Sequence, residues 1–481
     1  MEIRQYNKII WILLFLPILS LILQEIAWLR YSIDIPLLDD WRAYIIQEVG
    51  SFKLKDLFAS ANDTLYPVGK VLDALAYRAF QGNTIVYQFV SMFVILGALL
   101  LLQWRLLHLA LNNRLLAASA FTLTLLMMRP DTYWGLQNVA YHQAIPLVCL
   151  LSIIYIVIND KWHNNRLIIP ILCALGLISG LSYISGAIAV LTLSLVFLLF
   201  NKILKLKIKK SLFMGCLALL IIGIFTTLAQ LSVIIFIQHG THRPDAPMAY
   251  PNQIDFWLYL FGKVARSLML PYKTPLLSLT LTCVVLIFCI SLLIWSFSFL
   301  LRKRPSLIEA RPALIFVTLF GIIFTYLLIV AAGRANLHSP ELHKSLGIFS
   351  LGYLRFHYFW VTLLWPWVVA LLFTILKSLN LFNIQYRLSL IIPLIIIPFI
   401  IYAGGFNHSK FFKKILFFRM DLMECLVQNV QAGKDLPCPK SYAPPLSSVI
   451  YGKNIGASYW RLFTLLTIPT KKNDTNELQK A

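Results

Sequence analysis

Charged residues are scarce in this chain of 481 residues. Asp, Glu, Lys and Arg together make up 13% of it, whereas an ordinary soluble domain is about a quarter charged. Acids are the scarcest, with 20 Asp and Glu against 42 Lys and Arg, while 59% of the residues are hydrophobic. A soluble core cannot hold that many apolar side chains, and the composition equally excludes a disordered or collagen-like chain. The sequence therefore predicts a membrane protein, and its net charge of +22 does not indicate nucleic acid as a partner.

Nucleotide-binding motifs are missing from the connections between the apolar runs. Neither GxxxxGK[ST] nor GxGxxG occurs there, and these connections are too short for a nucleotide-binding fold. Heptads, low-complexity tracts and obvious internal repeats are missing as well. An ATP-driven pump is therefore not expected.

Cysteine is also sparse, and five of the seven cysteines lie in apolar runs, where a thiol packs as a small hydrophobe. The other two, Cys425 and Cys438, lie close together in the C-terminal tail. An oxidising compartment would let them form a disulfide across the turn at Gly433, and the alternative is two free thiols. No His or Cys pair stands nearby at the spacing of zinc ligands, so a zinc site is not expected.

Apolar runs near the length of a membrane span recur from one end of the chain to the other. They predict an all-α polytopic membrane protein with about eleven transmembrane helices, within a range of 9–13 because several runs are short. The runs are Ile9 to Trp28, Thr84 to Gln103, Leu115 to Met128, Val139 to Ile158, Leu167 to Gly180, Ala187 to Phe200, Ser211 to Ile237, Leu276 to Leu300, Pro312 to Ala332, His357 to Ile375 and Leu388 to Tyr402.

The distribution of basic residues predicts the orientation. With the N-terminus in the cytoplasm, the short cytoplasmic connections hold 17 basic residues against three acids, and the C-terminal tail lies outside. We interpret the first run as a retained signal anchor. Residues 1–402 are then one transmembrane module with outer loops at 30–83 (the first loop), 238–273 and 333–356, and residues 403–481 form a periplasmic tail.

Two adjacent acids stand at the first exit from the membrane. Asp39 and Asp40, followed by Trp41 and Arg42, come shortly after the first apolar run. Placing a carboxylate at headgroup depth costs free energy, so such a residue is expected to have an interaction partner or a functional role. Neighbouring like charges raise the pKa of one of them, which suits a group that accepts a proton near neutral pH. The alternative is a helix N-cap with an acid in its first turn.

The other outer segments carry aromatic, amide and basic side chains. Aromatic rings beside polar groups suit a sugar, and Arg at headgroup level can hold a phosphate. Each residue also fits a structural role, as part of an aromatic belt or as a snorkelling cation. The candidates for sugar or acceptor binding are Trp41, Asp63, Trp134, Gln137, His142 and Tyr358, and those for the donor phosphate are Arg334 and Arg355.

This arrangement resembles the GT-C class of membrane glycosyltransferases. The stretch from Leu38 to Arg42 is similar to the acidic motif in the first outer loop of that class. The stretch from Tyr133 to Gln137 is similar to a Trp-Gly-aromatic/Leu-Gln stretch of its bacterial members. Gly333 with Arg334, and later Leu354 to Tyr358, look like a Gly-Arg then Ser-Arg-Tyr signature, although the Ser-Arg-Tyr triplet is not intact here.

Among bacterial members, the size, the basicity and the outer tail resemble the serotype-converting O-antigen glucosyltransferases. The resemblance implies a GT-C-like bundle in the bacterial inner membrane with its active site facing the periplasm. It implies transfer of a hexose, with glucose expected, from undecaprenyl phosphate to a lipid-linked O-antigen of lipopolysaccharide or another envelope glycan. Asp40, assisted by Asp39, would be the catalytic base of an inverting displacement.

The implied partners are the polyprenyl-phosphate sugar, the lipid-linked acceptor, membrane lipid, a small flippase and a polyprenyl-phosphate glucosyltransferase. No cofactor is required by these residues, although the carboxylate pair leaves a divalent metal open. Two alternatives remain: an O-antigen polymerase or ligase, for which Arg243 and His242 would be the important residues, and a polysaccharide flippase or transporter. Few ionisable residues lie inside the apolar runs, which disfavours transport.

Overall fold

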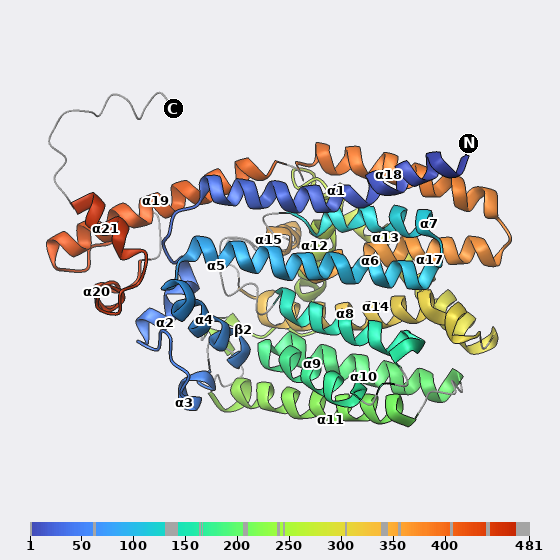
Figure 1. Ribbon diagram of the computed structural model, residues 1–481, viewed down its shortest axis with the longest axis horizontal. Helices are drawn as coiled ribbons and strands as arrows, with labels where there is room; N and C mark the ends of the chain where they lie inside the picture. Colours follow the sequence, from blue (N-terminus) through green and yellow to red (C-terminus); the bar gives the residue numbers. More distant parts are fainter. Residues whose placement is uncertain are drawn as a thin grey trace.

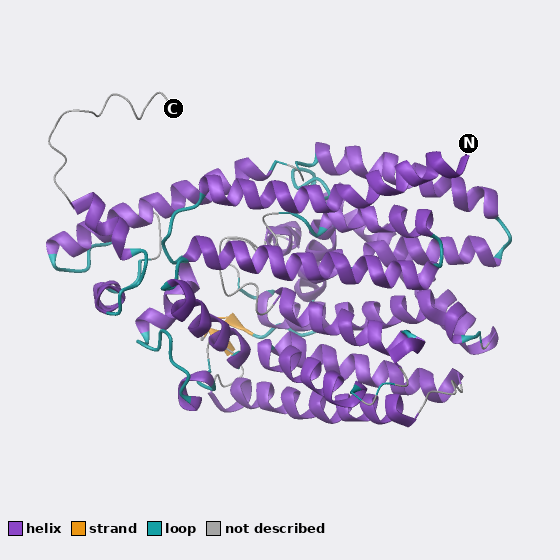
Figure 2. Ribbon diagram, in the orientation of Figure 1, coloured by secondary structure: helices purple, strands orange, loops and turns teal. Residues whose placement is uncertain are grey.

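The long helices of the molecule lie side by side as one bundle (Figure 1). This computed structural model describes residues 2–60, 64–129, 143–162, 165, 167–204, 210–237, 241–243, 246–303, 305–337, 345–354, 357–404, 407–438 and 443–467. The described chain is almost entirely helical, as expected for an all-α membrane protein. A hairpin of β1 (Thr241–Arg243) and β2 (Ala246–Pro247) stands out in orange in Figure 2.

The first half of the bundle runs from the N-terminus to residue 237. Its elements are α1 (Glu2–Tyr31), η1 (Leu38–Trp41), α2 (Arg42–Ile45), α3 (Leu54–Leu57), α4 (Pro67–Phe80), α5 (Thr84–Ser91), η2 (Met92–Leu96), α6 (Gly97–Leu111), α7 (Arg114–Phe121), η3 (Thr122–Leu126), α8 (Ile145–Ile158), η6 (Asp160–Trp162), α9 (Ile168–Ser182), α10 (Ile184–Leu204), α11 (Lys210–Ser232) and η7 (Val233–Ile237).

The second half follows the hairpin. Its elements are α12 (Ile254–Ser267), α13 (Pro275–Lys303), α14 (Leu307–Arg334), α15 (Ser345–Leu354), α16 (Phe359–Thr362), α17 (Trp365–Ser378), α18 (Phe382–Tyr402), α19 (His408–Ala432), α20 (Leu446–Asn454) and α21 (Trp460–Thr467). The module boundary predicted after residue 402 coincides with the end of α18.

Eight helices of the described chain are long and apolar enough to cross a membrane. They are Asn7–Tyr31, Thr84–Leu111, Ile184–Lys202, Lys210–Ile237, Pro275–Leu301, Leu307–Arg334, Phe359–Ser378 and Phe382–Tyr402. Each matches one of the eleven predicted runs. The other three runs correspond to shorter apolar helices, Arg114–Leu126, Ile145–Ile158 and Ile168–Ser182.

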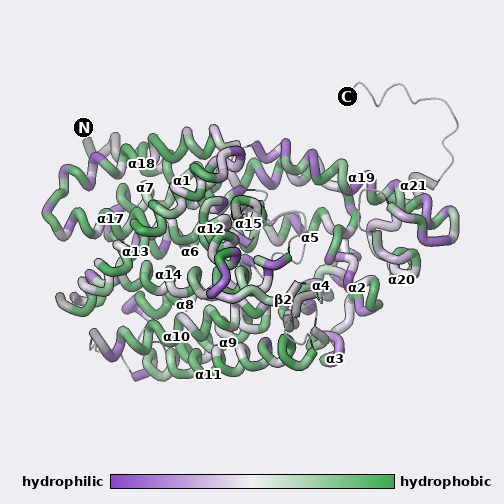
Figure 3. The backbone as a smooth tube through the Cα atoms, turned by 180° about the vertical axis from the view of Figure 1, so that it is seen from behind, coloured by the Kyte–Doolittle hydropathy of each residue, from purple (hydrophilic) through white to green (hydrophobic). Residues whose placement is uncertain are grey.

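Burial divides the long helices into a centre and a rim. In the most apolar window of the span Phe359–Ser378, which comprises α16 and α17, 78% of the residues are buried, and the figure for α14 is 67%, whereas it is 22% for α13 and α18. Isoleucine and leucine side chains on the outward faces of the rim helices are exposed, such as Ile287 on α13 and Leu394 on α18. Lipid is the solvent that such faces require. Figure 3 shows the apolar residues running along these helices.

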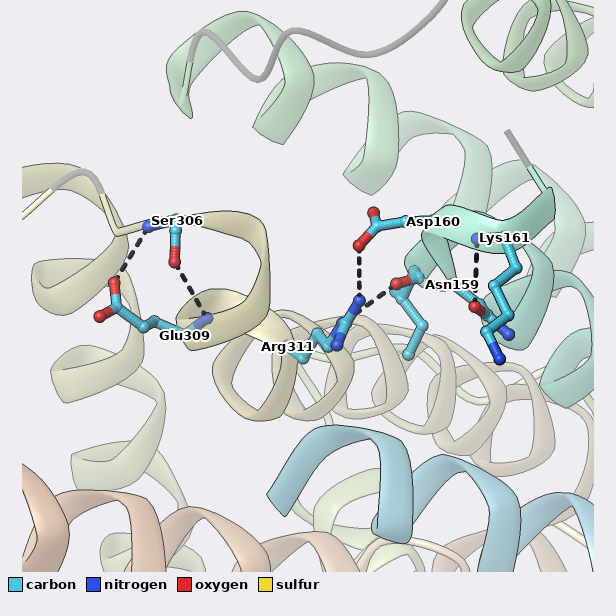
Figure 4. A network of polar contacts seen from close by, with 7 residues as sticks. Asn159, Asp160, Lys161, Ser306, Glu309 and Arg311 are labelled. Atoms are coloured by element: carbon cyan, nitrogen blue, oxygen red, sulfur yellow. Dashed lines mark hydrogen bonds and ion pairs between the residues drawn. The ribbon is translucent and has the colours of Figure 1, made fainter. Parts of the chain in front are cut away.

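Polar contacts fix the end of the bundle opposite to α2, α3 and α4 (Figures 1 and 4). The Ser306 hydroxyl accepts a hydrogen bond from the backbone N–H of Glu309, and the Glu309 carboxylate accepts one from the N–H of Ser306, which begins α14 with a capping box. The Arg311 guanidinium lies 2.9 Å from the Asp160 carboxylate and donates to the carbonyl of Ile158 at 3.1 Å. Asp160 and Glu309 therefore have local structural roles.

The tail begins by packing against the bundle. Helix α19 lies along α1, with the His408 imidazole 3.4 Å from the Ser20 hydroxyl and the Phe412 ring 5.8 Å from that of Trp28. Cys425 on α19 and Cys438 form a disulfide, which is the pairing that the sequence predicted. The bond closes the turn in which Gly433 takes the left-handed conformation, with φ of +63°.

The rest of the tail packs against the first loop. Side chains of both segments form a second hydrophobic core, here called the tail core. Tyr77 donates a hydrogen bond to the carbonyl of Ile455, and Tyr451 donates one to the carbonyl of Gln47 at 3.1 Å. The tail core therefore joins two segments that lie hundreds of residues apart. Its members are Ile35, Leu37, Trp41, Tyr44, Leu422, Leu426, Val427, Val449, Ala457, Tyr459 and Phe463.

Candidate functional site

A cleft in the first loop contains the two acids that the sequence singled out. The space between its walls is about 880 Å³, part of which is open to solvent, and it is formed by η1, α2, α3, α4, the start of α5 and the segments that join them. Its charged members are Asp39, Asp40, Arg42, Glu48, Asp56, Lys70 and Asp73, and its aromatic members are Tyr44, Tyr66, Tyr77 and Tyr87. We call it the first-loop cleft. Charged groups beside tyrosine rings suit a polar ligand that also has apolar faces.

The acids are held by a strained turn. Leu38 has φ of +50°, which is unfavourable for a residue with a side chain, and it comes directly before Asp39 and Asp40. The Asp40 carboxylate accepts a hydrogen bond from the backbone N–H of Leu37 at 3.3 Å, and its own N–H donates to the Leu37 carbonyl at 3.0 Å. Asp39 is exposed and Asp40 half-buried. The N-cap of η1 is Leu37, so neither acid is the cap itself, but Asp40 is the first-turn acid of that alternative, and its carboxylate also lines the cleft.

Buried polar contacts fix the entry to this turn. The Asp34 carboxylate accepts hydrogen bonds from the Thr84 N–H at 2.8 Å and from the Asn83 amide at 3.1 Å. The Arg419 guanidinium donates to the carbonyl of Ile33 at 2.9 Å. Burial lowers the pKa of Arg419 to about 10, while the charges of Asp40 and Asp34 act to raise it. These contacts tie the first loop to α5 and α19.

Helix α4 presents one polar face to the cleft. Lys70, Asp73 and Tyr77 follow each other at the spacing of one helix face, and all three line the cleft. The Lys70 ammonium lies 3.5 Å from the Glu48 carboxylate, donates to the carbonyl of Asp56 and sits 5.7 Å from the centre of the Tyr66 ring. Lys70 thereby joins α3 to α4.

Asp73 is the acid whose environment changes its protonation most clearly. Burial raises the pKa of Asp73 well above its usual value, and the nearby charge of Asp40 raises it further. A hydrogen bond with Tyr87 and the charge of Lys70 act in the opposite direction and are outweighed. The cleft therefore places a carboxyl group that tends to keep its proton beside Asp40. Such an arrangement is typical of sites that use one carboxyl group as an acid and another as a base.

Replacing Asp73 with Asn should change how stability depends on pH. Because the folded-state pKa of Asp73 is raised, the folded wild-type protein keeps a proton that the unfolded chain releases above pH ~4. Its free energy of unfolding should fall with rising pH by up to about 1.4 kcal/mol per unit, until the folded-state pKa is reached. Asp73→Asn should lose this contribution. Thermal unfolding of both proteins from pH 4 to 8 measures the difference.

Glu424→Gln is the control, because Glu424 is an exposed acid on α19 outside the cleft. It should follow the wild-type curve. Curves that stay parallel for Asp73→Asn and wild type would contradict the raised pKa.

Trp41 has a different place from the one that we expected. The sequence suggested a sugar-binding role, but the side chain is 0% exposed and does not line the cleft. Its ring lies 5.4 Å from that of Tyr44 and 5.1 Å from that of Tyr459, inside the tail core. Burial of the large indole surface between the first loop and the tail explains this position. In this structure Trp41 is part of the tail core, where it packs against Tyr44, a residue that lines the cleft.

Arg334 and Tyr358 are not among the residues that line the cleft. Arg334 is the last residue of α14 and is half-buried. Tyr358 is 1% exposed, and the Arg266 guanidinium lies 5.5 Å from its ring centre. Arg129 is part of the same group, since burial and then the charge of Arg266 lower its pKa. The structure therefore gathers the guanidinium groups of Arg129 and Arg266 near the buried ring of Tyr358.

Five of the predicted site residues lie outside the described residues: Arg355, Asp63, Trp134, Gln137 and His142. The side chains of His242 and Arg243 are likewise not described. Within the described chain, no group of three or more His, Cys, Asp or Glu is arranged to hold a metal ion.

Sequence reasoning missed Asp73, Glu48 and Asp56 as members of the site. A signal for Asp73 was available, because Lys70, Asp73 and Tyr77 repeat at helical spacing. Glu48 and Asp56 carry no comparable pattern, since Glu48 lies between turns and Asp56 in the four-residue helix α3.

Comparison with protein-family models, with curated proteins and with solved structures finds no match to this chain. The residues of the cleft and the organisation of the membrane helices are therefore the grounds for a functional proposal.

Proposed function

We propose that the protein is a membrane glycosyltransferase that moves a hexose, with glucose expected, from a polyprenyl-phosphate donor to a lipid-linked glycan. The first-loop cleft is the observation that carries this proposal. It combines the adjacent acids Asp39 and Asp40 with tyrosine rings, at one end of a bundle of membrane-length helices. A sugar offers hydroxyl groups to the acids and apolar ring faces to the tyrosines.

In the proposed reaction, Asp40 takes the proton from an acceptor hydroxyl group. That oxygen attacks the anomeric carbon, the bond from this carbon to the phosphate oxygen breaks, and the electron pair leaves with the polyprenyl phosphate. The configuration is inverted. Asp39 assists Asp40, and Asp73 is a further carboxyl group of the same cleft. Arg334 and Arg355 are proposed to hold the donor phosphate, because guanidinium groups bind phosphate oxygens through paired hydrogen bonds.

The setting of this activity is also a proposal. The distribution of basic residues favours an orientation in which the first loop and its cleft face away from the cytoplasm, and the resemblance to bacterial GT-C enzymes implies the inner membrane with the cleft on its periplasmic side. The acceptor would be an O-antigen or another envelope glycan on its lipid carrier. A small flippase and an enzyme that makes the polyprenyl-phosphate sugar would then supply the donor.

Purified full-length protein in lipid nanodiscs should transfer labelled glucose from undecaprenyl phosphate to a lipid-linked O-antigen acceptor. The measurement is the mass of the glycan, which should rise by one hexose for each transfer. Joining of whole repeat units, without use of the donor, would instead indicate a polymerase or ligase. Movement of unaltered glycolipid between leaflets, without any new bond, would indicate a flippase.

A further inference from the structure

Glu25 is a buried acid inside the first membrane-length helix. It lies in the span Asn7–Tyr31, six residues before the end of that span, which is about 9 Å along a helix. Glu25 is 6% exposed, and neither of its carboxyl oxygens has a hydrogen-bond partner among the described residues. An ionisable group at that depth is costly, and groups of this kind are typically functional.

A buried amide on α5 lies across from this acid. Gln88 is 2% exposed, and its Nε2 has no hydrogen-bond partner within the described chain. Helices α1 and α5 pack side by side in opposite directions (Figure 1), and near the end of α1 the Trp28 indole donates to the carbonyl of Ile85 at 3.1 Å. Glu25 is one turn before Trp28, and Gln88 is one turn after Ile85. The two polar side chains therefore lie at the same level of this contact.

The elements of the bundle that surround Glu25 are apolar. The stretches Thr84–Leu96, which contains α5 and η2, and Thr122–Leu126, which is η3, have no charged residue. Helices α6 and α7 carry Arg105, His108 and Arg114 toward the end of the bundle opposite to the first loop. Burial without a compensating charge favours the neutral form of an acid.

Helix α19 carries the other titratable groups that lie along α1. Burial lowers the pKa of His408 to about 4, so its imidazole is uncharged near neutral pH. The Arg419 guanidinium lies 5.1 Å from the ring centre of Trp28, and the charges that act on it are those of Asp40 and Asp34. The remaining charged residues of α19 are exposed or half-buried, and they are Lys410, Lys413, Lys414, Asp421 and Glu424.

A neutral Glu25 complements Gln88. The O–H of the acid can donate to the Gln88 Oε1, while its C=O accepts from the Gln88 Nε2–H, so one acid–amide pair provides partners for both side chains. An ionised carboxylate can only accept, and it would face the Gln88 Oε1 without a proton between the two oxygens. The pairing of these two residue types therefore favours the protonated acid.

The contact between α1 and α5 leads to the turn that holds the two acids of the cleft. Beyond Trp28, the Asp34 carboxylate accepts a hydrogen bond from the N–H of Thr84, the first residue of α5. On the other side, α5 changes into the π-helix η2 at Met92, one turn after Gln88, and π-turns are frequent at functional sites. A change at Glu25 can thus reach the entry to the first-loop cleft through α5.

We propose that Glu25 is an intramembrane proton-binding site, in which the neutral acid pairs with Gln88. The ligand is a proton. When it is released, the O–H bond breaks, the proton passes to water and a negative charge remains in the α1–α5 contact. The contact is then weaker, and so is the attachment of Asp34 to Thr84. This site does not depend on the proposed function.

Infrared difference spectroscopy tests the proton directly. The full-length protein is placed in nanodiscs of ether-linked lipid, which has no ester carbonyl to obscure the signal. Wild type minus Glu25→Gln should show the C=O band of one neutral carboxyl group at pH 7, where an exposed glutamate is only about 0.2% protonated. Asp73 is the same in both proteins and cancels. Raising the pH to about 10 should replace this band with carboxylate bands.

Glu424→Gln is the matched control, because Glu424 is exposed. Wild type minus this variant should show carboxylate bands at pH 7. Gln88→Leu should move the Glu25 band to higher frequency, because its C=O loses the hydrogen bond from the amide. Carboxylate bands for Glu25 at pH 7, or a neutral band that persists at pH 10, would overturn the proton-binding site. A band that Gln88→Leu leaves in place would overturn the pairing.

Hydrogen exchange tests the link to the cleft. In the wild-type protein, the Thr84 N–H should lose protection once the pH passes the value at which the infrared band disappears, after correction for the intrinsic exchange rate. Glu25→Gln, whose amide stays neutral and can still pair with Gln88, should keep that protection. Equal loss in both proteins contradicts the link. A protein that transfers no hexose can still give every expected result, so a failure of the proposed function is seen separately.

Discussion

Asp40→Asn should lower the rate of hexose transfer by about 10²- to 10⁴-fold, which is the usual contribution of a positioned general base. The amide cannot accept the proton of the attacking hydroxyl group. It can still accept the hydrogen bond that Leu37 donates to Asp40 in the wild-type protein, so the turn should keep its shape. Initial rates with a labelled undecaprenyl-phosphate sugar, measured at equal amounts of folded protein, give the ratio.

Asp39→Asn distinguishes the contribution of Asp39 to the transfer rate from that of Asp40. Asp39 is exposed, and the hydrogen bond that fixes the turn goes to Asp40, so we expect a smaller loss from this variant. Glu424→Gln again controls for the loss of a negative charge elsewhere. If Asp40→Asn and Asp39→Asn both keep the wild-type rate, neither acid is the base, and the proposed mechanism is wrong.

Trp41→Ala should destabilise the contact between the first loop and the tail by about 3–5 kcal/mol, the usual cost of truncating a large buried aromatic side chain. The indole is fully buried and packs edge-on against Tyr44 and Tyr459. Its loss leaves a cavity in the tail core, so the tail should become more sensitive to protease. Limited proteolysis with mass mapping of the fragments, together with thermal unfolding, measures both effects.

Trp41→Phe is the matched variant. The Trp41 N–H has no hydrogen-bond partner among the described residues, so removing it should leave no new unsatisfied group. Phe keeps most of the apolar contact, and its cost should therefore be well below that of Ala. A role in sugar binding predicts a different pattern. Trp41→Ala would then keep the wild-type protease resistance and would weaken binding of the acceptor.

The membrane helices could be predicted well from the sequence, because apolar length is a local property of the chain. All eight candidate spans fall on predicted apolar runs. The run predicted to end at Tyr402 stops at the same residue as α18. The disulfide between Cys425 and Cys438 was predictable for a similar reason, since the two residues are close in sequence and both lie outside the apolar runs.

The surroundings of Asp39 and Asp40 were harder to predict. Their importance followed from the cost of charge near a membrane, but the role of Trp41 depends on Tyr459, more than 400 residues further along the chain. No local pattern in the first loop shows that a ring from the tail will cover the indole. Arg334 presents the same difficulty, since its distance from the acids is set by the packing of α14 in the bundle and not by sequence spacing.

The tail core also sets an order of events during biosynthesis. At about 5–20 residues per second, the roughly 400 residues between Tyr44 and Val449 take on the order of 20 to 80 seconds to translate. Throughout that time the rings of Trp41 and Tyr44 have no tail to cover them, because Val449, Tyr459 and Phe463 do not yet exist. The acid-bearing turn is thus among the first parts of the protein to be made and among the last to reach its final packing. A nascent chain therefore carries an incompletely packed cleft until its final helices have folded.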